Sequence, residues 1–306
     1  MFLSEEFYGK YRAGVLKKIG ILYHPRVEAT QRKASEIEGI LRARGITAWV
    51  CSAWDKTGAA GRLDGTDLLL TVGGDGTVLR AVQIAVPGNI PIAGINLGKL
   101  GFMTEMDAGE VPQKLPEIIG ASGWIDERSM LQAEATISGR SQTFHALNDI
   151  VVARGEIARL IRVEVDIDGE RLTTYKADGV IAATATGSTG YALAVGGPIL
   201  YPQSPDILLV AVAPHLSPGY ALVLPETATV TLRLQTYQPG TLSIDGHVNL
   251  AIADGDVVTV KRSPHTARFW RVHPRGSFYT SLEEKLRGKH GVPGRKSQNT
   301  GHNSNP

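Results

Sequence analysis

The sequence has only one cysteine, Cys51, which excludes an intrachain disulfide framework and fits a reducing compartment. No apolar run approaches the roughly 20 residues that a membrane-spanning helix needs. The first residues, MFLSEEFYGKYRAG, contain acidic side chains and lack the apolar centre of a secretory signal. A net charge of +2 provides no large field for nucleic acid or an acidic membrane. We therefore expect a cytoplasmic protein with no nucleic-acid partner and no membrane partner.

Several common enzyme signatures are also missing. The sequence has no Gly-x-x-x-x-Gly-Lys-Ser/Thr loop, and Gly74-x-Gly76-x-x-Leu79 lacks the third glycine of the dinucleotide motif. No Gly-x-Ser-x-Gly segment of a serine hydrolase occurs. We assign no metal-ligating residue, because three histidines without metal-ligand spacing fit structural roles better: His145, His215 and His265.

The composition that is present is typical of a globular protein with two domains. The 306 residues suffice for two cores, and the apolar fraction of 42% and charged fraction of 20% are ordinary values. The 35 glycines suit tight turns and close contact between the backbone and a ligand.

The most informative stretch is residues 67–80, DLLLTVGGDGTVLR. The apolar run that ends at Val72 predicts a strand buried on both faces, and the segment after Gly76 predicts a helix with an apolar face. The glycine-rich turn at residues 73–77 lets a ligand approach the backbone, and free N–H groups at the helix start attract anions. Together these features predict a phosphate site.

Asp75 brings a negative charge into this predicted phosphate site, which is a poor choice for anion affinity alone. A carboxylate at this position is explained if Asp75 accepts the proton of a hydroxyl that is about to be phosphorylated. A structural alternative is a tight strand-to-helix turn in which Asp75 caps the helix. Arg80, in the second turn of that helix, has its own structural alternative as a solvated side chain.

The first half of the sequence predicts alternating strands and helices, and hence a parallel sheet. Strands are expected at residues 18–23, 46–51, 67–72 and 91–96, and helices at residues 28–44 and 109–120. Residues 52–66 have turn chemistry and are expected to form a mobile loop near the ligand. We place this α/β domain at residues 15–123, after an N-terminal extension of residues 1–14.

The second half predicts strands that follow one another with little helix between them, which is typical of an antiparallel sandwich. We place this domain at residues 124–265, followed by a strand and helix at 266–286 that return to the first domain and a disordered tail at 287–306. The expected strands are residues 131–138, 143–153, 161–168, 171–177, 179–184, 207–213, 229–234, 241–245, 257–262 and 267–272, and the expected helix is residues 277–286.

A second chemical stretch covers residues 175–201. Its turn at residues 187–190, GSTG, offers hydroxyls and N–H groups that favour phosphate or ribose. Upstream, Asn148 and Asp149 interrupt an apolar strand, and a buried polar group without a partner costs about 1–3 kcal/mol. An adenine edge or ribose hydroxyls would satisfy them, although a strand edge that faces water is a simpler explanation for the pair alone.

These motifs, in this order, make the sequence resemble the NAD kinase family from about residue 18 to residue 286. The Gly-Gly-Asp-Gly-Thr turn alone is shared with diacylglycerol, sphingosine and phosphofructo-type kinases. The stretch from residue 186 to residue 198 is therefore the part that is specific to the NAD kinase family. The resemblance depends on residues 73–77 (GGDGT), 94–102 (GINLGKLGF), 148–149 (ND), 178–179 (DG), 186–191 (TGSTGY) and 196–198 (GGP).

The resemblance implies an N-terminal α/β domain with a parallel, Rossmann-like sheet and a C-terminal all-β sandwich. It implies transfer of the γ-phosphoryl of ATP, or of polyphosphate, to the adenosine-ribose 2′-hydroxyl of NAD, with Asp75 as the catalytic base. It also implies Mg²⁺ or another divalent cation and a homodimer or homotetramer, with some NAD contacts made across the subunit interface. The implied NAD contacts are Asp75, Gly76, Arg80, Asn148, Asp149, Arg159, Lys176, Asp178, Thr189, Gly190, Tyr191, Ala192, Leu193, Ala194 and His247.

Three positions depart from the family pattern. Asp149 stands where the family usually has Glu, so its carboxylate reaches about one methylene less far and its ribose contact needs a shifted backbone or a water. Ala185 replaces a proline and Gly190 replaces an alanine, so the loop is expected to be less pre-organised and to bind its ligand more weakly. No departure removes a reacting group.

Two alternative functions stay open. A lipid kinase of the diacylglycerol type usually carries a Pro-x-Gly-Thr-x-Asn-Asp segment after its glycine turn, whereas residues 94–98 read GINLG here. A non-catalytic NAD(H)-binding regulator would not need Asp75. The sequence leaves open the choice between ATP and polyphosphate, between NAD and NADH, and between dimer and tetramer.

Overall fold

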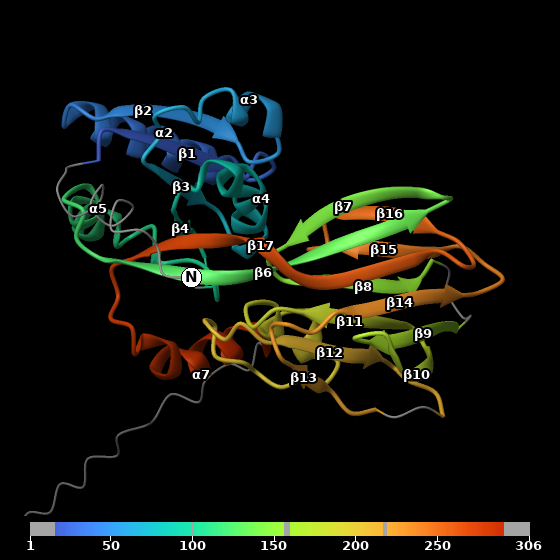
Figure 1. Ribbon diagram of the computed structural model, residues 1–306. Helices are drawn as coiled ribbons and strands as arrows, with labels where there is room; N and C mark the ends of the chain where they lie inside the picture. The colour runs from blue at the N-terminus through green and yellow to red at the C-terminus, as the bar shows by residue number, and fades with distance from the viewer. Residues whose placement is uncertain (1–15, 99–100, 156–159, 217–218, 291–306) are drawn as a thin grey trace, which may run out of the picture.

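The computed structural model, shown in Figure 1, describes residues 16–98, 101–155, 160–216 and 219–290. These residues form an 11-stranded sheet and a six-stranded sheet. One end of the larger sheet is parallel and has helices on both faces, and its other end packs on the smaller sheet. The predicted fold class, a parallel α/β domain followed by a β-sandwich, is therefore confirmed.

The parallel part is built from strands in the order β4-β3-β1-β2. Each residue of the central strand β3 is buried, because Leu68 and Leu70 pack with α2 while Leu69 packs with α4 on the opposite face. This two-sided burial explains the unbroken apolar run in the sequence. The elements are β1 (Lys18–Tyr23), α2 (Glu28–Ala43), β2 (Thr47–Ser52), β3 (Leu68–Val72), α4 (Asp75–Ala85), β4 (Ile92–Asn96) and α5 (Val111–Ile119).

The segment 52–66, for which the sequence predicted only turns, contains the short helix α3 (Lys56–Ala60). Asp55 caps this helix, because its Oδ1 accepts a hydrogen bond of 2.9 Å from the N–H of Gly58. One helical turn is too short to show an apolar period, which is why the pattern missed it. Two further short elements follow in this half: the 3-10 turn Val86–Gly88 and β5 (Met106–Asp107).

The sandwich encloses its own core, in which alternate residues of the two sheets meet. Most predicted strands are present, and β13 and β16 were not predicted. The elements are β6 (Trp124–Ile137), β7 (Arg140–Ala146), β8 (Asp149–Arg154), β9 (Ile161–Ile167), β10 (Glu170–Ala177), β11 (Gly179–Ala183), the 3-10 turn Gly187–Thr189, α6 (Tyr191–Ala194), β12 (Ile207–Val212), β13 (Leu222–Leu224), β14 (Val230–Gln235), β15 (Gly240–Ile244), β16 (Val248–Ile252) and β17 (Val257–Arg271).

Strand β17 joins the two halves of the larger sheet (Figure 1). Its start pairs with β14 in the sandwich, and its end pairs in parallel with β4 through Phe269 and Ile92. The sequence predicted two strands here, at 257–262 and 267–272, but the chain continues through an irregularity between Arg262 and Thr266. The side chains at the end of β17 therefore lie beside the α/β half.

The prediction of one strand over residues 143–153 was wrong. The segment forms β7, which pairs with β6 in the larger sheet, and β8, which pairs with β11 and β15 in the smaller sheet. The chain crosses between the sheets at Leu147 and Asn148. Asn148 therefore lies at the crossing and Asp149 is the first residue of β8, so neither stands in the interior of a strand.

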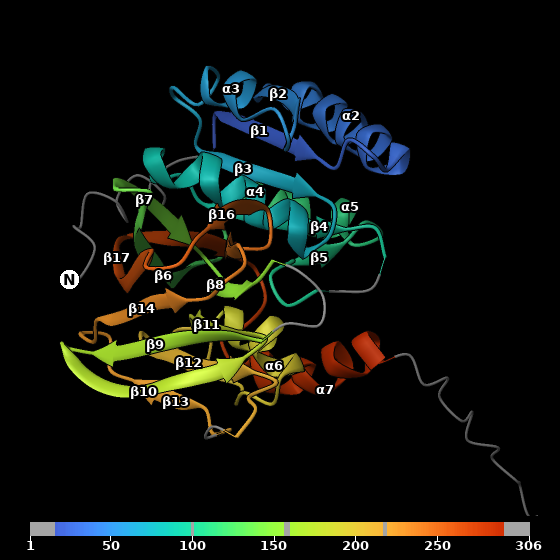
Figure 2. The same ribbon diagram turned by 90° about the vertical axis from the view of Figure 1, so that its right-hand side faces the viewer.

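The last described element, α7 (Ser277–His290), lies below the α/β half and close to α6 in both views (Figures 1 and 2). Its first turn packs against Tyr201, whose ring centroid is 5.8 Å from that of Phe278. Among the described residues, no helix combines the length and the apolar character required to cross a bilayer.

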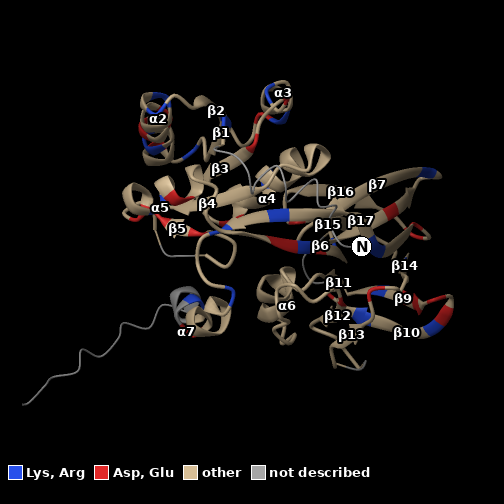
Figure 3. Ribbon diagram, turned by 60° about the vertical axis from the view of Figure 1, so that its left-hand side comes forward, with Lys and Arg blue, Asp and Glu red and all other residues tan. Residues whose placement is uncertain are grey.

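Acidic and basic residues are interspersed along α2 and along the β9–β10 hairpin (Figure 3). Helix α2 carries the ion pair between Arg42 and Glu38, at 2.7 Å, and β10 places Arg171 against Glu164. This mixing agrees with the small net charge of the chain.

Candidate functional site

The glycine turn between β3 and α4 has the geometry of a phosphate-binding turn. Gly73 has a φ of 154°, and a Cβ there would lie 2.3 Å from Oγ1 of Thr77, so only glycine fits. Gly74 caps α4, and both Gly74 and Gly76 are exposed to solvent. The free N–H groups and the positive end of the α4 dipole therefore face a space that an anion can enter.

The structural alternative was right about a tight strand-to-helix turn but wrong about the cap, because Gly74 caps α4 and Asp75 is its first residue. Its carboxylate points away from its own helix and accepts two backbone hydrogen bonds, from Phe102 at 3.0 Å and from Met103 at 3.1 Å. Gly101 makes this approach possible, since a Cβ there would lie 2.1 Å from Oδ1 of Asp75. The half-buried carboxylate is held in one position by a distant segment of the chain.

The crossing between β7 and β8 is fixed by Asp245, in the turn between β15 and β16. Its carboxylate accepts the N–H groups of Leu147, Asn148 and Asp149, at 2.9, 2.7 and 3.2 Å. Burial raises the pKa of Asp245, and although these hydrogen bonds lower it, the net shift is upward. The sequence analysis missed this residue, although Asp245-Gly246 is a recognisable turn signal.

Asn148 and Asp149 carry unused hydrogen-bonding capacity. Among the described residues, the buried Oδ1 of Asn148 has no hydrogen-bond partner. Burial, and after it the nearby Asp245, raise the pKa of Asp149 to about 7. A ligand with donor groups, such as an adenine amine or ribose hydroxyls, would satisfy both side chains.

The Thr184–Gly190 loop packs directly on this pair. The hydroxyl of Thr184 donates to the carbonyl of Leu147 at 2.6 Å and accepts the N–H of Gly187 at 3.0 Å. A Cβ at Gly187 would lie 2.0 Å from the carbonyl oxygen of Asn148, and one at Gly190 would lie 3.9 Å from Oδ2 of Asp149. The structure thus brings the two sequence motifs, residues 148–149 and 186–190, into contact.

A cavity beside the N-terminus of α4 brings together three of the predicted residues, Gly76, Arg80 and His247. The Arg80 guanidinium lies 4.2 Å from the ring centroid of Trp54. Arg80 is therefore stacked on an aromatic wall of the cavity and is not a freely solvated side chain, and Trp54 is a lining residue that the sequence analysis missed.

Other predicted residues are not gathered at this cavity. Lys176 and Asp178 lie where β10 leads into β11, and Asp178 forms an ion pair of 3.1 Å with Arg154. Tyr191 is 45% exposed at the start of α6, a helix that also carries Ala192, Leu193 and Ala194. Arg159 lies outside the described residues.

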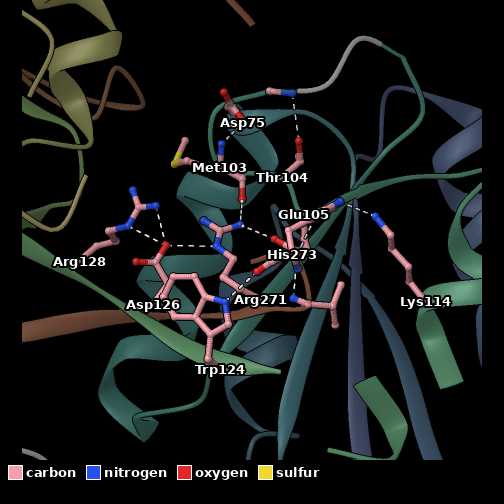
Figure 4. Close-up of polar contacts among 12 residues, drawn as sticks. Asp75, Met103, Thr104, Glu105, Lys114, Trp124, Asp126, Arg128, Arg271 and His273 are labelled. Carbon is pink, nitrogen blue, oxygen red and sulfur yellow. Dashed lines mark hydrogen bonds and ion pairs between the residues drawn. The ribbon is translucent and has the colours of Figure 1, made fainter. Parts of the chain in front are cut away.

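A buried charge network lies next to Asp75 (Figure 4). Arg271, at the end of β17, donates to Asp126 at 3.1 Å, to Glu105 at 3.2 Å and to the carbonyl of Met103 at 2.9 Å. Burial raises the pKa of Asp126, but Arg271 and Arg128 outweigh it and hold the value at about 2.

Arg128 extends this network to the second loop, because its Nη1 donates to the hydroxyl of Thr186 at 3.2 Å. The network therefore connects the segment that holds Asp75 with the loop that packs on Asn148. Sequence reasoning missed these charged residues. Their signal was weak: Asp126 and Arg128 share one face of β6, between Trp124 and Met130 on that face.

Comparison with known proteins gives a consistent match over both halves. The family described as the ATP-NAD kinase N-terminal domain matches residues 12–122, and that described as the ATP-NAD kinase C-terminal domain matches residues 147–272. The NAD kinase of Dehalococcoides mccartyi strain CBDB1 is 46% identical over 274 residues, which are 89% of this chain and 96% of that protein. The NAD kinase of Chloroflexus aurantiacus strain J-10-fl is 40% identical over 274 residues, 89% and 99% of the two chains.

Solved structures show the same fold. The yeast NADH kinase, in complex with NADH, matches with a TM-score of 0.81 at 25% identity over 94% of this chain and 91% of that chain. An NAD kinase from Archaeoglobus fulgidus, in complex with ATP, matches with a TM-score of 0.71 at 24% identity over 88% and 98% of the two chains.

Proposed function

The chain belongs to the NAD kinase family and is a phosphotransferase that phosphorylates NAD, and on this basis we propose the details of its reaction. The γ-phosphoryl group of ATP is transferred to the 2′-hydroxyl of the adenosine ribose of NAD, which gives NADP and ADP. The family that matches the chain is described as ATP-NAD kinase, which supports ATP as the donor. The yeast relative is a complex with NADH, which supports a dinucleotide acceptor.

The position of Asp75 is the observation on which the mechanism depends. It is a half-buried carboxylate at a glycine turn, beside the N–H groups of a helix start. Each of its oxygens accepts one backbone hydrogen bond and keeps a further lone pair. One of these lone pairs accepts the proton of the ribose hydroxyl as that oxygen attacks phosphorus.

The rest of the site positions the reactants and manages their charge. The N–H groups of residues 74–76 and the α4 dipole stabilise charge on the transferring phosphoryl group. Asn148, whose side-chain oxygen has no partner among the described residues, and Asp149 hold the adenosine, with Gly190 packed beside them and Thr189 next to it in the chain. Gly76, Arg80 and His247 contact the same dinucleotide from the cavity at α4.

We propose that Mg²⁺ or another divalent cation arrives bound to the donor phosphates. Among the described residues, no cluster of three or more His, Cys, Asp or Glu side chains could hold a metal ion. Mg²⁺ commonly keeps several waters and binds through phosphate oxygens with one or two carboxylates, so it belongs to the substrate in this proposal. It neutralises phosphate charge, and no step assigned here to the chain depends on its position.

We also propose a cytoplasmic homodimer or homotetramer. Lys176, Asp178 and the exposed Tyr191 do not line the α4 cavity of the same chain, which fits contacts with NAD across a subunit interface. The family resemblance implies that Arg159 also lies at the dinucleotide, and that residues 192–194 belong to the loop against its adenine end. Light scattering gives the oligomeric state. Mixing inactive Asp75→Asn with inactive Asp178→Asn subunits tests the shared site, because recovery of activity requires residues from two chains.

A coupled assay tests the reaction. The purified chain, NAD, ATP and Mg²⁺ are combined, and NADP is detected with an NADP-specific dehydrogenase. Asp75→Asn should lower kcat at least about a hundredfold, because the amide cannot accept the ribose proton and keeps only one of the two backbone hydrogen bonds. The Kd for NAD should stay within a few-fold, because the other contacts with NAD are unchanged. Asp64→Asn, on the exposed surface of the same domain, serves as the matched control. Normal turnover in Asp75→Asn would remove Asp75 from the base role. If the unaltered chain bound NAD but made no NADP, the alternative function, a non-catalytic NAD(H)-binding regulator, would be favoured.

A further inference from the structure

His273 lies two residues after the end of β17, and both nitrogens of its ring have partners (Figure 4). Nδ1 lies 2.9 Å from Oε1 of Glu105, and Nε2 lies 2.5 Å from Nζ of Lys114 on α5. The ring is half-buried, and the indole N–H of Trp124 donates to the backbone carbonyl of the same residue at 2.8 Å. The proposed reaction gives no role to this histidine.

We assign the tautomer of His273 from these partners. A lysine ammonium has only donors, so the Nε2 atom that faces Lys114 accepts a hydrogen bond and carries no proton. The Nδ1 atom therefore carries the ring proton and donates to Glu105. Lys114 is itself held by an ion pair of 2.6 Å with Glu110, one turn earlier at the start of α5.

Glu105 gathers four donors on one buried carboxylate. Oε1 accepts the ring N–H of His273 and the backbone N–H groups of Val272 at 2.7 Å and His273 at 2.8 Å. Oε2 accepts Arg271 at 3.2 Å. Burial raises the pKa of Glu105, but His273 and Arg271 lower it, and the net shift is downward. The carboxylate is therefore charged, and its donors fix its orientation.

The segment that contains Glu105 also holds the proposed base. Met103, two positions earlier, donates its N–H to Asp75 at 3.1 Å. Its carbonyl accepts from Nη1 of Arg271, and the same nitrogen donates to Glu105. If the Glu105 carboxylate rotates, Arg271 must therefore follow it or lose a bond, and in either case the support of Met103 changes.

We propose that His273 is a positioning residue, which keeps the Glu105 carboxylate oriented toward Arg271. Through Arg271 and Met103 it keeps Asp75 in place for the reaction proposed above, on which this inference rests. The Nδ1 donor is the part of the ring that matters for the base. Its loss should therefore lower turnover and leave the contacts with NAD intact.

Two substitutions separate the two ring nitrogens in steady-state kinetics on the full chain. The amide nitrogen of His273→Asn takes about the place of Nδ1 and still donates to Glu105, whereas the longer side chain of His273→Gln brings its amide near Lys114. His273→Gln should lower kcat about tenfold and leave the KM for NAD and for ATP within about threefold. His273→Asn should restore kcat to within about threefold of the unaltered chain.

His265→Gln, at the exposed irregularity of β17, is the matched control and should leave kcat unchanged. Equal kcat values for His273→Asn and His273→Gln would overturn the proposal. A rise in either KM without a fall in kcat would overturn it as well, because the ring would then contact a substrate.

Nitrogen NMR without substrates separates this inference from the reaction. In the unaltered chain, the His273 ring should carry its proton on Nδ1 and none on Nε2, and its signals are assigned by their absence in His273→Gln. The amide signal of Met103 should shift in His273→Gln and stay in place in His265→Gln. If no donor yields NADP but these results hold, the reaction fails and the positioning of Asp75 stands. A proton on Nε2, or an unshifted Met103 amide in His273→Gln, would overturn the inference.

Discussion

Asp75 and Arg271, which are 196 positions apart in the sequence, are joined through a single residue, Met103. The N–H of Met103 donates to the Asp75 carboxylate at 3.1 Å, and its carbonyl accepts from the Arg271 guanidinium at 2.9 Å (Figure 4). The position of the proposed base thus depends on a buried cation at the end of β17. Because β17 belongs to both halves of the larger sheet, this link connects the base to the sandwich.

Replacing Arg271 with lysine should lower kcat by about tenfold to a hundredfold and change the KM for NAD little. Lysine keeps the charge but cannot bind Asp126, Glu105 and Met103 at once, so the segment that holds Asp75 loosens. The buried network also loses about 2–4 kcal/mol of folding free energy. Kinetics and chemical unfolding measure the two effects. Arg268→Lys, on the same strand, is the control, and an equal fall in its kcat would contradict a specific role for Arg271.

Gly101→Ala should lower kcat at least about a hundredfold. The new Cβ would lie 2.1 Å from Oδ1 of Asp75, so the carboxylate or the backbone must move. Gly98→Ala is a matched control in the same segment, because a Cβ there meets no atom within 4 Å. The two variants are compared by kcat and by melting temperature. Similar kcat values for both would show that Asp75 does not need its present position.

Much of the fold was predictable from periodicity. Strands such as β3 are buried on both faces and leave unbroken apolar runs, and the β9–β10 hairpin follows from the alternation at residues 162–167 and the Asp168-Gly169 turn. The glycine turn and the role of residues 148–149 as polar groups in need of partners could be identified because local chemistry defines them. The unpartnered amide oxygen of Asn148 agrees with that interpretation.

Long-range relationships could not be predicted in the same way. Asp75 as a helix N-cap fits the local sequence, yet the carboxylate binds backbone groups about 27 positions away. Residues 143–153 look like a single strand interrupted by two polar residues. The sequence pattern does not show the change of sheet at this point, because the residue that fixes it, Asp245, lies nearly a hundred positions later. The ion pairs of Arg271 with Glu105 and Asp126 could not be predicted for the same reason. The partners are far apart in the sequence, and only the tertiary fold brings them together.

The pH dependence of stability should reveal the buried Asp149. Burial, and after it Asp245, raise its pKa from the ordinary value of 3.8 to about 7, so the folded state holds a proton there that the unfolded state releases. The folding free energy that it contributes is therefore present below pH 4 and is lost as the pH rises to 7, on the order of 4 kcal/mol in all. Chemical unfolding between pH 4 and pH 8 measures the slope.

Asp149→Asn should flatten that slope, since its side chain does not titrate. Asp64→Asn, which removes an exposed carboxylate, should keep the slope of the unaltered chain. An unchanged slope in Asp149→Asn would assign the titration to another group.

Asp245→Asn should raise the KM for NAD about tenfold or more and change kcat less. The carboxylate accepts three consecutive N–H groups, whereas an asparagine has one acceptor oxygen and an amide group that faces those donors. The crossing at Leu147 and Asn148 would shift, and with it the proposed adenosine contacts. Unsatisfied N–H groups also cost about 1–3 kcal/mol each, so the variant should unfold at lower denaturant concentration.

Asp256→Asn separates positioning from a general loss of stability. Asp256 also accepts two backbone N–H groups, from Ser138 at 3.1 Å and from Ala253 at 2.8 Å, but it does so in the loop before β17, near the β6–β7 turn. Its replacement should lower stability and leave the KM for NAD unchanged. If both variants raise the KM equally, the effect of Asp245 is a loss of folding. If only Asp245→Asn does so, the β15–β16 turn positions the residues that recognise the dinucleotide.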